Sequence, residues 1–187
     1  VDSGDSCTYS MSGAPSTITL SSGTISGTPV NANVGAHTIT VSCSDGSLSV
    51  SDEYVLTVAN TNDAPTVTSA IADASTAEDA SYSLNAAAAF TDVDSGDTLT
   101  YTMSGAPSTL SISSGTISGT PTNANVGAHT IVVTATDGSN AAVSDTFILT
   151  VTNTNDAPTI SSTAVTTATE DAAYSYTTTA ADVDVGD

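Results

Sequence analysis

The chain has 187 residues, of which 20 are acidic and none is lysine or arginine, so its formal net charge is −20. Such a chain repels polyanions along its whole length, and we therefore expect neither nucleic acid nor an anionic membrane surface as a partner. No run approaches the roughly 18 apolar residues that a membrane span requires, which predicts no span in this segment.

An internal repeat of about 92 residues organises the chain. The segment Met11–Thr17 is identical to Met103–Thr109, and Ser21–Pro29 is identical to Ser113–Pro121. A period of this length matches a whole small domain. We therefore expect an array of near-identical domains: residues 1–63 as a domain that lacks its first strands, 64–156 as a complete domain, and 157–187 as the first strands of a further domain.

Within one period the signals are almost entirely those of β-strands. Short runs rich in Thr, Val, Ile and Tyr are separated by Gly, Pro, Asn and Asp; they are Ser81–Leu84, Leu99–Met103, Leu110–Ser113, Thr116–Ser118, His129–Thr136 and Asp145–Thr152. Apolar residues alternate with threonines, as in half-buried antiparallel strands, which argues against disorder despite the acidity. The pattern predicts an all-β fold of tandem Ig-like sandwiches. Ala86–Ala89 looks helical but is too short to nucleate a helix.

The sequence Asn-Thr-Asn-Asp-Ala-Pro occurs twice, at residues 60–65 and 153–158. Proline pushes the preceding alanine into an extended conformation and stiffens the passage. We interpret both copies as short, extended, oxygen-rich links between domains.

The acidic motif Asp92-Val93-Asp94-Ser95-Gly96-Asp97 recurs as residues 182–187 and in part as residues 1–5. Alternate residues of an extended segment point to the same side, so each Asp-x-Asp pair is expected to converge on one point, with Asp97 as a third carboxylate after a glycine turn. Two carboxylates about 5 Å apart repel by roughly 3 kcal/mol at an effective dielectric constant of 20. The chain has no cation of its own, so the motif predicts Ca²⁺ binding. A solvated acidic surface without calcium is the alternative.

These motifs resemble those of known repeats. Asn-Thr-Asn-Asp-Ala-Pro is similar to the linker of cadherin repeats, and Asp-Val-Asp followed by Gly-Asp and Leu-Thr-Tyr is similar to the start of dystroglycan-type cadherin-like domains. Gly-Thr-Ile-Ser-Gly-Thr-Pro with Val-Thr-Ala-Thr-Asp-Gly resembles the Ig-like repeats of large bacterial surface adhesins and fibre proteins. The resemblance spans the whole chain and implies tandem cadherin-like sandwiches with Ca²⁺ at their junctions.

The resemblance also implies a ligand set at each junction, carried over from the matching motifs. At the first junction it comprises Asn60, Asn62, Asp63, Asp92, Asp94 and Asp137. At the second it comprises Glu78, Asn153, Asn155, Asp156, Asp182 and Asp184. The cadherin motif Leu-Asp-Arg-Glu is missing, and Thr-Asn-Ala-Asn-Val-Gly stands in its place. Fewer acidic ligands imply weak affinity, with a dissociation constant of about 10⁻⁴ to 10⁻³ M.

The two cysteines lead to a separate prediction. Cys7 matches Leu99 of the following repeat, and Cys43 matches Ala135. One repeat has thus exchanged two apolar residues together, which indicates that the two positions are in contact. We expect a disulfide, and with it an oxidising compartment. Two separate buried thiols are the alternative.

No motif points to catalysis. His37 and His129 occupy the same Gly-Ala-His-Thr site in successive repeats, and no serine has a motif that places it beside both a histidine and a carboxylate. A carboxylate pair duplicated in every repeat suits a scaffold better than a glycosidase dyad. We expect no catalytic residues and no enzymatic activity.

The ends of the chain allow two interpretations. It starts after the position of a domain's first strands and ends just past such strands, at residues 159–182. If the ends are native, the tail of one subunit would complete the open sandwich of the next, which gives an open filament. The alternative is a window cut from a longer tandem chain. Either route predicts an elongated, repetitive fibre.

Together these features predict a structural or adhesive repeat of an extracellular fibre, on a bacterial surface and stiffened by Ca²⁺ between domains. Its expected partners are neighbouring repeats or copies of itself, and a host or cell-surface ligand. The alternative function is a carbohydrate- or receptor-binding module, which would need exposed aromatic residues. The chain has six tyrosines, two phenylalanines and no tryptophan, so stacking on sugars has little support.

Overall fold

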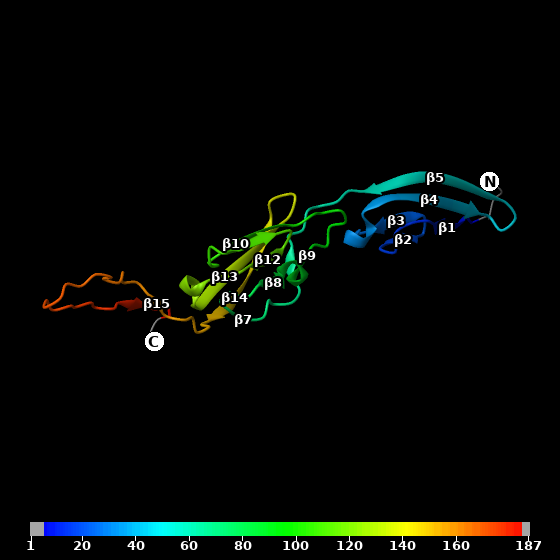
Figure 1. Ribbon diagram of the computed structural model, residues 1–187. Coiled ribbons are helices and arrows are strands. Elements are labelled where there is room, and N and C mark those ends of the chain that lie inside the picture. The colour runs from blue at the N-terminus through cyan, green and yellow to red at the C-terminus, as the bar shows by residue number, and fades with distance from the viewer. Residues whose placement is uncertain (1–5, 185–187) are drawn as a thin grey trace. The chain divides into compact units, whose positions relative to one another are not determined.

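The computed structural model describes residues 6–184, and within that range the chain is all-β with three short 3₁₀ turns (Figure 1). Two compact units are present: unit 1 comprises Val1–Asp63 with Val93–Gly96, and unit 2 comprises Ala64–Asp92 with Asp97–Asp187. The predicted division into three parts at residues 63 and 156 stays a prediction. The acidic motif at residues 1–5 and the last three residues of the motif at 182–187 lie outside the described range. Among the described residues, no helix is long and apolar enough to span a bilayer.

Unit 1 consists of one antiparallel sheet and one hairpin. Its elements are β1 (Thr8–Ser12), β2 (Ile18–Ser21), β3 (Thr24–Gly27), the 3₁₀ turn η1 (Asn31–Asn33), β4 (Gly35–Ser44) and β5 (Ser49–Val58). The sheet has the order β1-β4-β5, and β2 pairs with β3. The buried centre of the unit is Ile39 on β4, whose side chain is fully inaccessible to solvent.

Unit 2 has the two facing sheets of a sandwich. Its elements are β6 (Thr66–Val67), β7 (Ala74–Ala77), β8 (Tyr82–Asn85), η2 (Ala86–Ala89), β9 (Phe90–Thr91), β10 (Thr100–Ser104), β11 (Leu110–Ser113), β12 (Thr116–Gly119), η3 (Asn123–Asn125), β13 (Gly127–Thr136), β14 (Ala142–Thr152), β15 (Thr159–Ile160) and β16 (Ala180–Ala181). One sheet has the order β10-β13-β14-β7, and the other has the order β11-β12-β8. Two short pairs, β6-β9 and β15-β16, complete the unit.

The core of unit 2 follows from the period of two along its long strands. Phe147, Leu149 and Val151 on β14 are at most 1% exposed, whereas Ile148 between them is 41% exposed. Ile117 on β12 closes the core from the other sheet and is fully buried. The prediction of an all-β sandwich is confirmed.

The local differences from the predicted elements have simple causes. β13 and β14 begin at Gly127 and Ala142, earlier than the predicted strands, because the antiparallel register continues beyond the apolar runs. The four alanines form the 3₁₀ turn η2, since the amides of Ala86 and Ala87 both donate to the carbonyl of Gly115 at 2.9 and 3.0 Å. The carbonyl of Gly115, from another strand pair, thus accepts the hydrogen bonds that four alanines alone could not form within a helix.

The two cysteines of unit 1 form a disulfide, with 5.6 Å between their Cα atoms. Cys43 lies on β4 directly opposite Tyr9 of β1, and Cys7 lies two residues before Tyr9. The bond therefore ties the start of β1 to the end of β4, in the register that the two strands already share.

Truncation of the core should affect unit 2 far more than truncation of its surface. Phe147→Ala should lower the free energy of unfolding by about 3–5 kcal/mol, because it removes a fully buried ring and leaves a cavity. Ile148→Ala, on the outward face of the same strand, should cost less than about 1 kcal/mol. Urea denaturation followed by circular dichroism measures both values, and equal losses would contradict the assigned faces.

The disulfide can be tested by labelling. Without reductant, the folded chain should take up no alkylating reagent in mass spectrometry. Reduction should destabilise unit 1 by about 3–4 kcal/mol in the chain-entropy model, given the separation of 36 residues. The double variant Cys7→Ser/Cys43→Ser should be insensitive to reductant. Two labelled thiols in the untreated chain would refute the bond.

Candidate metal site

Acidic side chains from separate segments of unit 2 gather at one place. Glu78 and Asp79 follow β7, and Asp156 lies in the link that follows β14. Each of the three offers a carboxylate oxygen, and these oxygens lie within 4.8 Å of one another. The parallel pairing of β7 with the end of β14 explains the meeting, because it brings the residues after both strands to the same edge.

Glu78 is the buried member of this cluster and is only 2% exposed. Its amide donates to the carbonyl of Thr152 at 3.0 Å, which extends the strand pairing by one bond. Its Oε1 accepts a hydrogen bond from the amide of Thr154 at 2.8 Å. Its Oε2 is buried and has no hydrogen-bond partner. Burial of a carboxylate oxygen without a partner is costly, and a bound cation would offset this cost.

Asp184 connects the C-terminal segment to the same region and is 7% exposed. Its Oδ2 accepts from the amide of Asp156 at 2.6 Å, and its Oδ1 accepts from Nδ2 of Asn123 at 2.9 Å. Asp182 does not share these partners, since its Oδ1 accepts from the amide of Asp184 at 2.9 Å. The Asp-x-Asp pair therefore forms a local turn, in which one carboxylate orients the backbone of the other.

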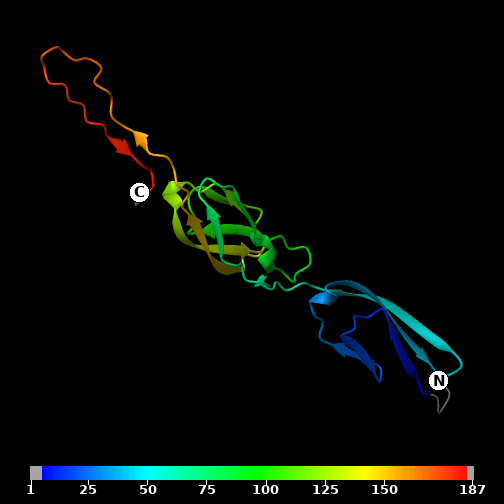
Figure 2. The same ribbon diagram turned by 60° about the horizontal axis from the view of Figure 1, so that its bottom comes forward.

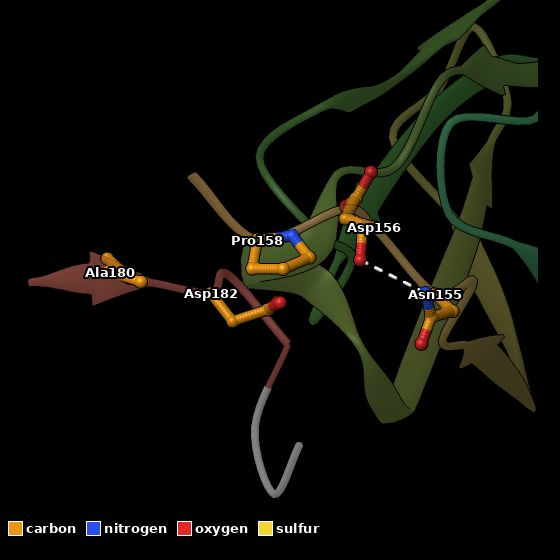
Figure 3. A pocket seen from close by; sticks show the side chains of 6 residues that line it. Asn155, Asp156, Pro158, Ala180 and Asp182 are labelled. Atoms are coloured by element: carbon orange, nitrogen blue, oxygen red, sulfur yellow. Dashed lines mark hydrogen bonds between the residues drawn. The ribbon is translucent and has the colours of Figure 1, made fainter. Parts of the chain in front are cut away.

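An open depression lies beside this region (Figure 3). It is lined by Asn155, Asp156, Pro158, Ala180, Ala181 and Asp182. Nδ2 of Asn155 donates to the carbonyl of Asp156 at 3.0 Å, which leaves the amide oxygen of Asn155 outside that bond. The lining thus offers further oxygen atoms from the link and from the residues after β16.

Unit 1 repeats part of this arrangement. The amide of Asp63 donates to Oδ2 of Asp94 at 2.7 Å, as the amide of Asp156 donates to Asp184. Nδ2 of Asn31 donates to Oδ2 of Asp63 at 2.7 Å. A separate local cluster lies within the loop of residues 92–97, where Asp92, Asp94 and Asp97 each offer an oxygen within 4.8 Å of the others.

The other predicted ligands have varied surroundings. Nδ2 of Asn62 donates to the carbonyl of Asp63 at 3.0 Å, and Asn60 and Asn153 are exposed. Asp137 is buried, and its Oδ1 accepts from the amides of two residues in its own loop at 2.8 Å. Asp45, its match in unit 1, does the same for Leu48 and Ser47, and these bonds lower the pKa of its carboxyl group. Asp137 thus has a structural part in its loop, and its assignment as a ligand stays a prediction.

Sequence reasoning missed Asp79 and Asn123. Asp79 is held at φ 56° with its amide donating to the carbonyl of Pro121 at 2.8 Å, which aims its side chain at the cluster. The pair Glu-Asp recurs at Glu170-Asp171, and this repetition was the available signal. Asn123 belongs to the segment that stands in place of the cadherin Leu-Asp-Arg-Glu motif. This segment contains no charged residue, so nothing in its sequence indicated a site.

The family of the chain follows from comparison with known proteins. A family model described as "Putative Ig domain" matches residues 1–59 and 64–152, one match in each unit. The chain belongs to this family. The two Ig domains so defined agree with the cadherin-like and Ig-like repeats predicted from the motifs. A search of curated proteins found no match.

Several solved structures with a similar fold are cadherin fragments. Human mucin-like protocadherin EC1-2 is 16% identical, with a TM-score of 0.59, over 79% of this chain and 85% of that chain. Mouse cadherin-23 EC22-24 is 22% identical, with a TM-score of 0.55, over 83% and 57%. Drosophila N-cadherin EC1-4 is 17% identical, with a TM-score of 0.52, over 81% and 42%. These TM-scores show a shared fold and no more than that.

Two variants of an endo-fucoidan hydrolase of glycoside hydrolase family 107 also match, and the chain spans 24% of their length. The wild-type enzyme is 25% identical over 81% of this chain, with a TM-score of 0.42. A likeness of this degree covers a part of the enzyme and carries no argument about activity in the Ig domains.

The electrostatics of the cluster can be tested without any metal. Glu78→Gln should raise the free energy of unfolding in chelator by on the order of 1–2 kcal/mol, because it removes one charge from three crowded carboxylates. This value is below the Coulomb estimate, since Asp79 is exposed and screened. Glu53→Gln, on the exposed surface of β5, serves as the control and should change little. Chemical denaturation in EDTA measures both variants, and a destabilised Glu78→Gln would contradict the crowding.

Proposed function

We propose that the chain is a structural or adhesive module of an extracellular fibre on a bacterial surface, and that Ca²⁺ bound at the acidic cluster stiffens the link after its second Ig domain. The observation that carries the proposal is the Oε2 atom of Glu78, which is buried without a hydrogen-bond partner beside the carboxylates of Asp79 and Asp156. The chain has no lysine or arginine that could neutralise them.

The donor set fits a hard divalent cation. Glu78, Asp79 and Asp156 would hold the ion, and all offer carboxylate oxygen, which is the ligand type that Ca²⁺ prefers. Asp184 would orient the site through the amide of Asp156. Zn²⁺ fits less well, because these ligands include neither cysteine nor histidine. Ca²⁺ also accepts irregular arrangements that Mg²⁺ does not, which suits side chains from unlike segments.

The mechanical effect follows from where the three residues are attached. Glu78 and Asp79 belong to the end of β7, whereas Asp156 belongs to the link. An ion held by both would fix the link to the sheet edge and remove conformational freedom from residues that otherwise have exposed backbone. A link ordered in this way transmits a fixed direction to whatever follows it, which is what a fibre needs.

The cellular location is part of the same proposal. Weak sites with dissociation constants of about 10⁻⁴ to 10⁻³ M are filled in the extracellular medium, where calcium is abundant. The disulfide between Cys7 and Cys43 supports an oxidising compartment. The resemblance of the motifs to bacterial adhesin repeats supports the surface of a bacterium.

Thermal melting tests the calcium site. If the dissociation constant is about 10⁻⁴ M, 10 mM CaCl₂ should stabilise unit 2 by about 2.7 kcal/mol relative to EDTA, because the ion binds only the folded state. Asp156→Asn should lose most of this gain, whereas Asp52→Asn on the exposed surface of β5 should keep it. The same concentration of MgCl₂ should have a smaller effect. A midpoint that is unchanged by calcium would remove the ion from the proposal.

A further inference from the structure

Asparagine side chains donate hydrogen bonds to aspartates beside both links. Nδ2 of Asn123 donates to Oδ1 of Asp184 at 2.9 Å, and Nδ2 of Asn31 donates to Oδ2 of Asp63 at 2.7 Å. A carboxylate can only accept, so the nitrogen and not the oxygen of each amide must face it. In a chain without lysine or arginine, a neutral amide thus takes the place that a basic side chain could have beside these carboxylates.

Both oxygens of Asp184 accept hydrogen bonds from the protein. Oδ2 accepts from the backbone amide of Asp156 at 2.6 Å, while Oδ1 accepts from Asn123. Asp184 is 7% exposed, so these charge-assisted bonds are largely shielded from water. Asp184 therefore connects the link to η3 through two hydrogen bonds, and neither bond involves an ion.

The turn η3 is itself fixed to the body of unit 2, at the end from which the link leaves (Figure 2). Oδ1 of Asn125 accepts from the amide of Thr122 at 3.0 Å and from Oγ1 of Thr109 at 2.9 Å. The carbonyl of Asn125 accepts from Nε2 of His129 on β13 at 2.7 Å. Because η3 is held from two sides, Asn123 is a donor on a rigid support.

Unit 1 repeats this arrangement with one change of partner. The carbonyl of Asn33 in η1 accepts from Nε2 of His37 at 2.7 Å, so η1 is held to β4 as η3 is held to β13. The backbone amide of Asp63 in the first link donates to Oδ2 of Asp94 at 2.7 Å. Here the asparagine of the turn, Asn31, bonds the aspartate of the link directly. A fixed turn, an asparagine donor and an aspartate that accepts from the link thus occur together twice.

We infer that Asn123, supported by η3, is a positioning residue that fastens the link to unit 2 through Asp184 in the absence of calcium. Amide donors then compensate the carboxylate of Asp184, which leaves those of Glu78, Asp79 and Asp156 for an ion. The link has one hydrogen-bonded attachment at η3, and calcium would add a second attachment at the end of β7. The hydrogen-bonded attachment does not rest on the proposed function.

Hydrogen exchange of one backbone amide tests this attachment. In EDTA, the amide of Asp156 should be protected in the intact chain, as measured by NMR. Asp184→Ala and Asn123→Ala should each speed its exchange by about tenfold or more, because each removes a hydrogen bond of a charged group. The amide of Leu149 on β14 serves as the control for a folded Ig domain and should stay protected. An Asp156 amide that exchanges in EDTA as fast as in an unstructured peptide would overturn the inference.

A swap of the two side chains tests the pairing itself. Asn123→Asp should abolish the protection of the Asp156 amide in EDTA, because it places two carboxylates together. The double variant Asn123→Asp/Asp184→Asn should restore the protection, since the introduced amide can accept from Asp156 and donate to the introduced carboxylate. Thr146→Glu adds the same charge on the exposed face of β14, where unit 1 has Glu53, and should change nothing. A double variant that is no better protected than Asn123→Asp would overturn the pairing.

The same amide separates this inference from the calcium proposal. Protection of Asp156 in EDTA that is lost in Asn123→Asp and regained in the double variant supports the attachment, even if CaCl₂ leaves the melting midpoint of the chain unchanged. Protection that is found only in CaCl₂ would overturn the attachment and leave the calcium site standing.

Discussion

Unit 2 buries the carboxylate of Glu78 although the chain has no basic residue to pair with it. Glu78 is placed at the end of β7 by the parallel ladder with β14, and one of its oxygens is satisfied by the amide of Thr154. The other oxygen has no hydrogen-bond partner, with two further carboxylates close by. A nearby lysine or arginine could neutralise this charge, but the chain has neither residue. In the calcium proposal a bound ion neutralises this charge, and the location of the cluster would then make the order of the link depend on that ion.

The two Ig domains show what the first strands of this fold contribute. Where β7 and β8 are present, the side chains of β12 and β14 form a closed core. In unit 1, the same sequence positions stay partly exposed, although β2 to β5 repeat the sequence of their counterparts closely. The disulfide of unit 1 ties the start of β1 to the end of β4 and so stabilises the sheet β1-β4-β5. β3 and β12 have the same sequence, and β3 is less buried because no strand lies beside it in the place that β8 takes beside β12, within the described residues.

The calcium proposal centres on one short segment, the pair Glu78-Asp79 that stands between β7 and β8. At Glu78 this segment covers a core and delivers a buried carboxylate together. Closing the sandwich and assembling the cluster are thus the same structural event. A fibre that contains such a unit would, under the calcium proposal, gain stiffness from the ion bound beside the link.

The amino-acid sequence alone determined the repeat, the all-β class and most of the acidic residues of the site, because alternation, turn residues and identical motifs are local properties of the chain. It did not reveal Asp79 or Asn123, nor that Asp182 would bond the backbone of Asp184 instead of sharing a point with it. The place of Asp79 depends on the parallel pairing of β7 with β14, whose partners are more than 70 positions apart, and the place of Asn123 depends on its bond to Asp184, 61 positions away. Only the tertiary structure decides which carboxylates become neighbours and which oxygen is left buried without a partner, because contacts between distant segments are set by packing and not by spacing along the chain.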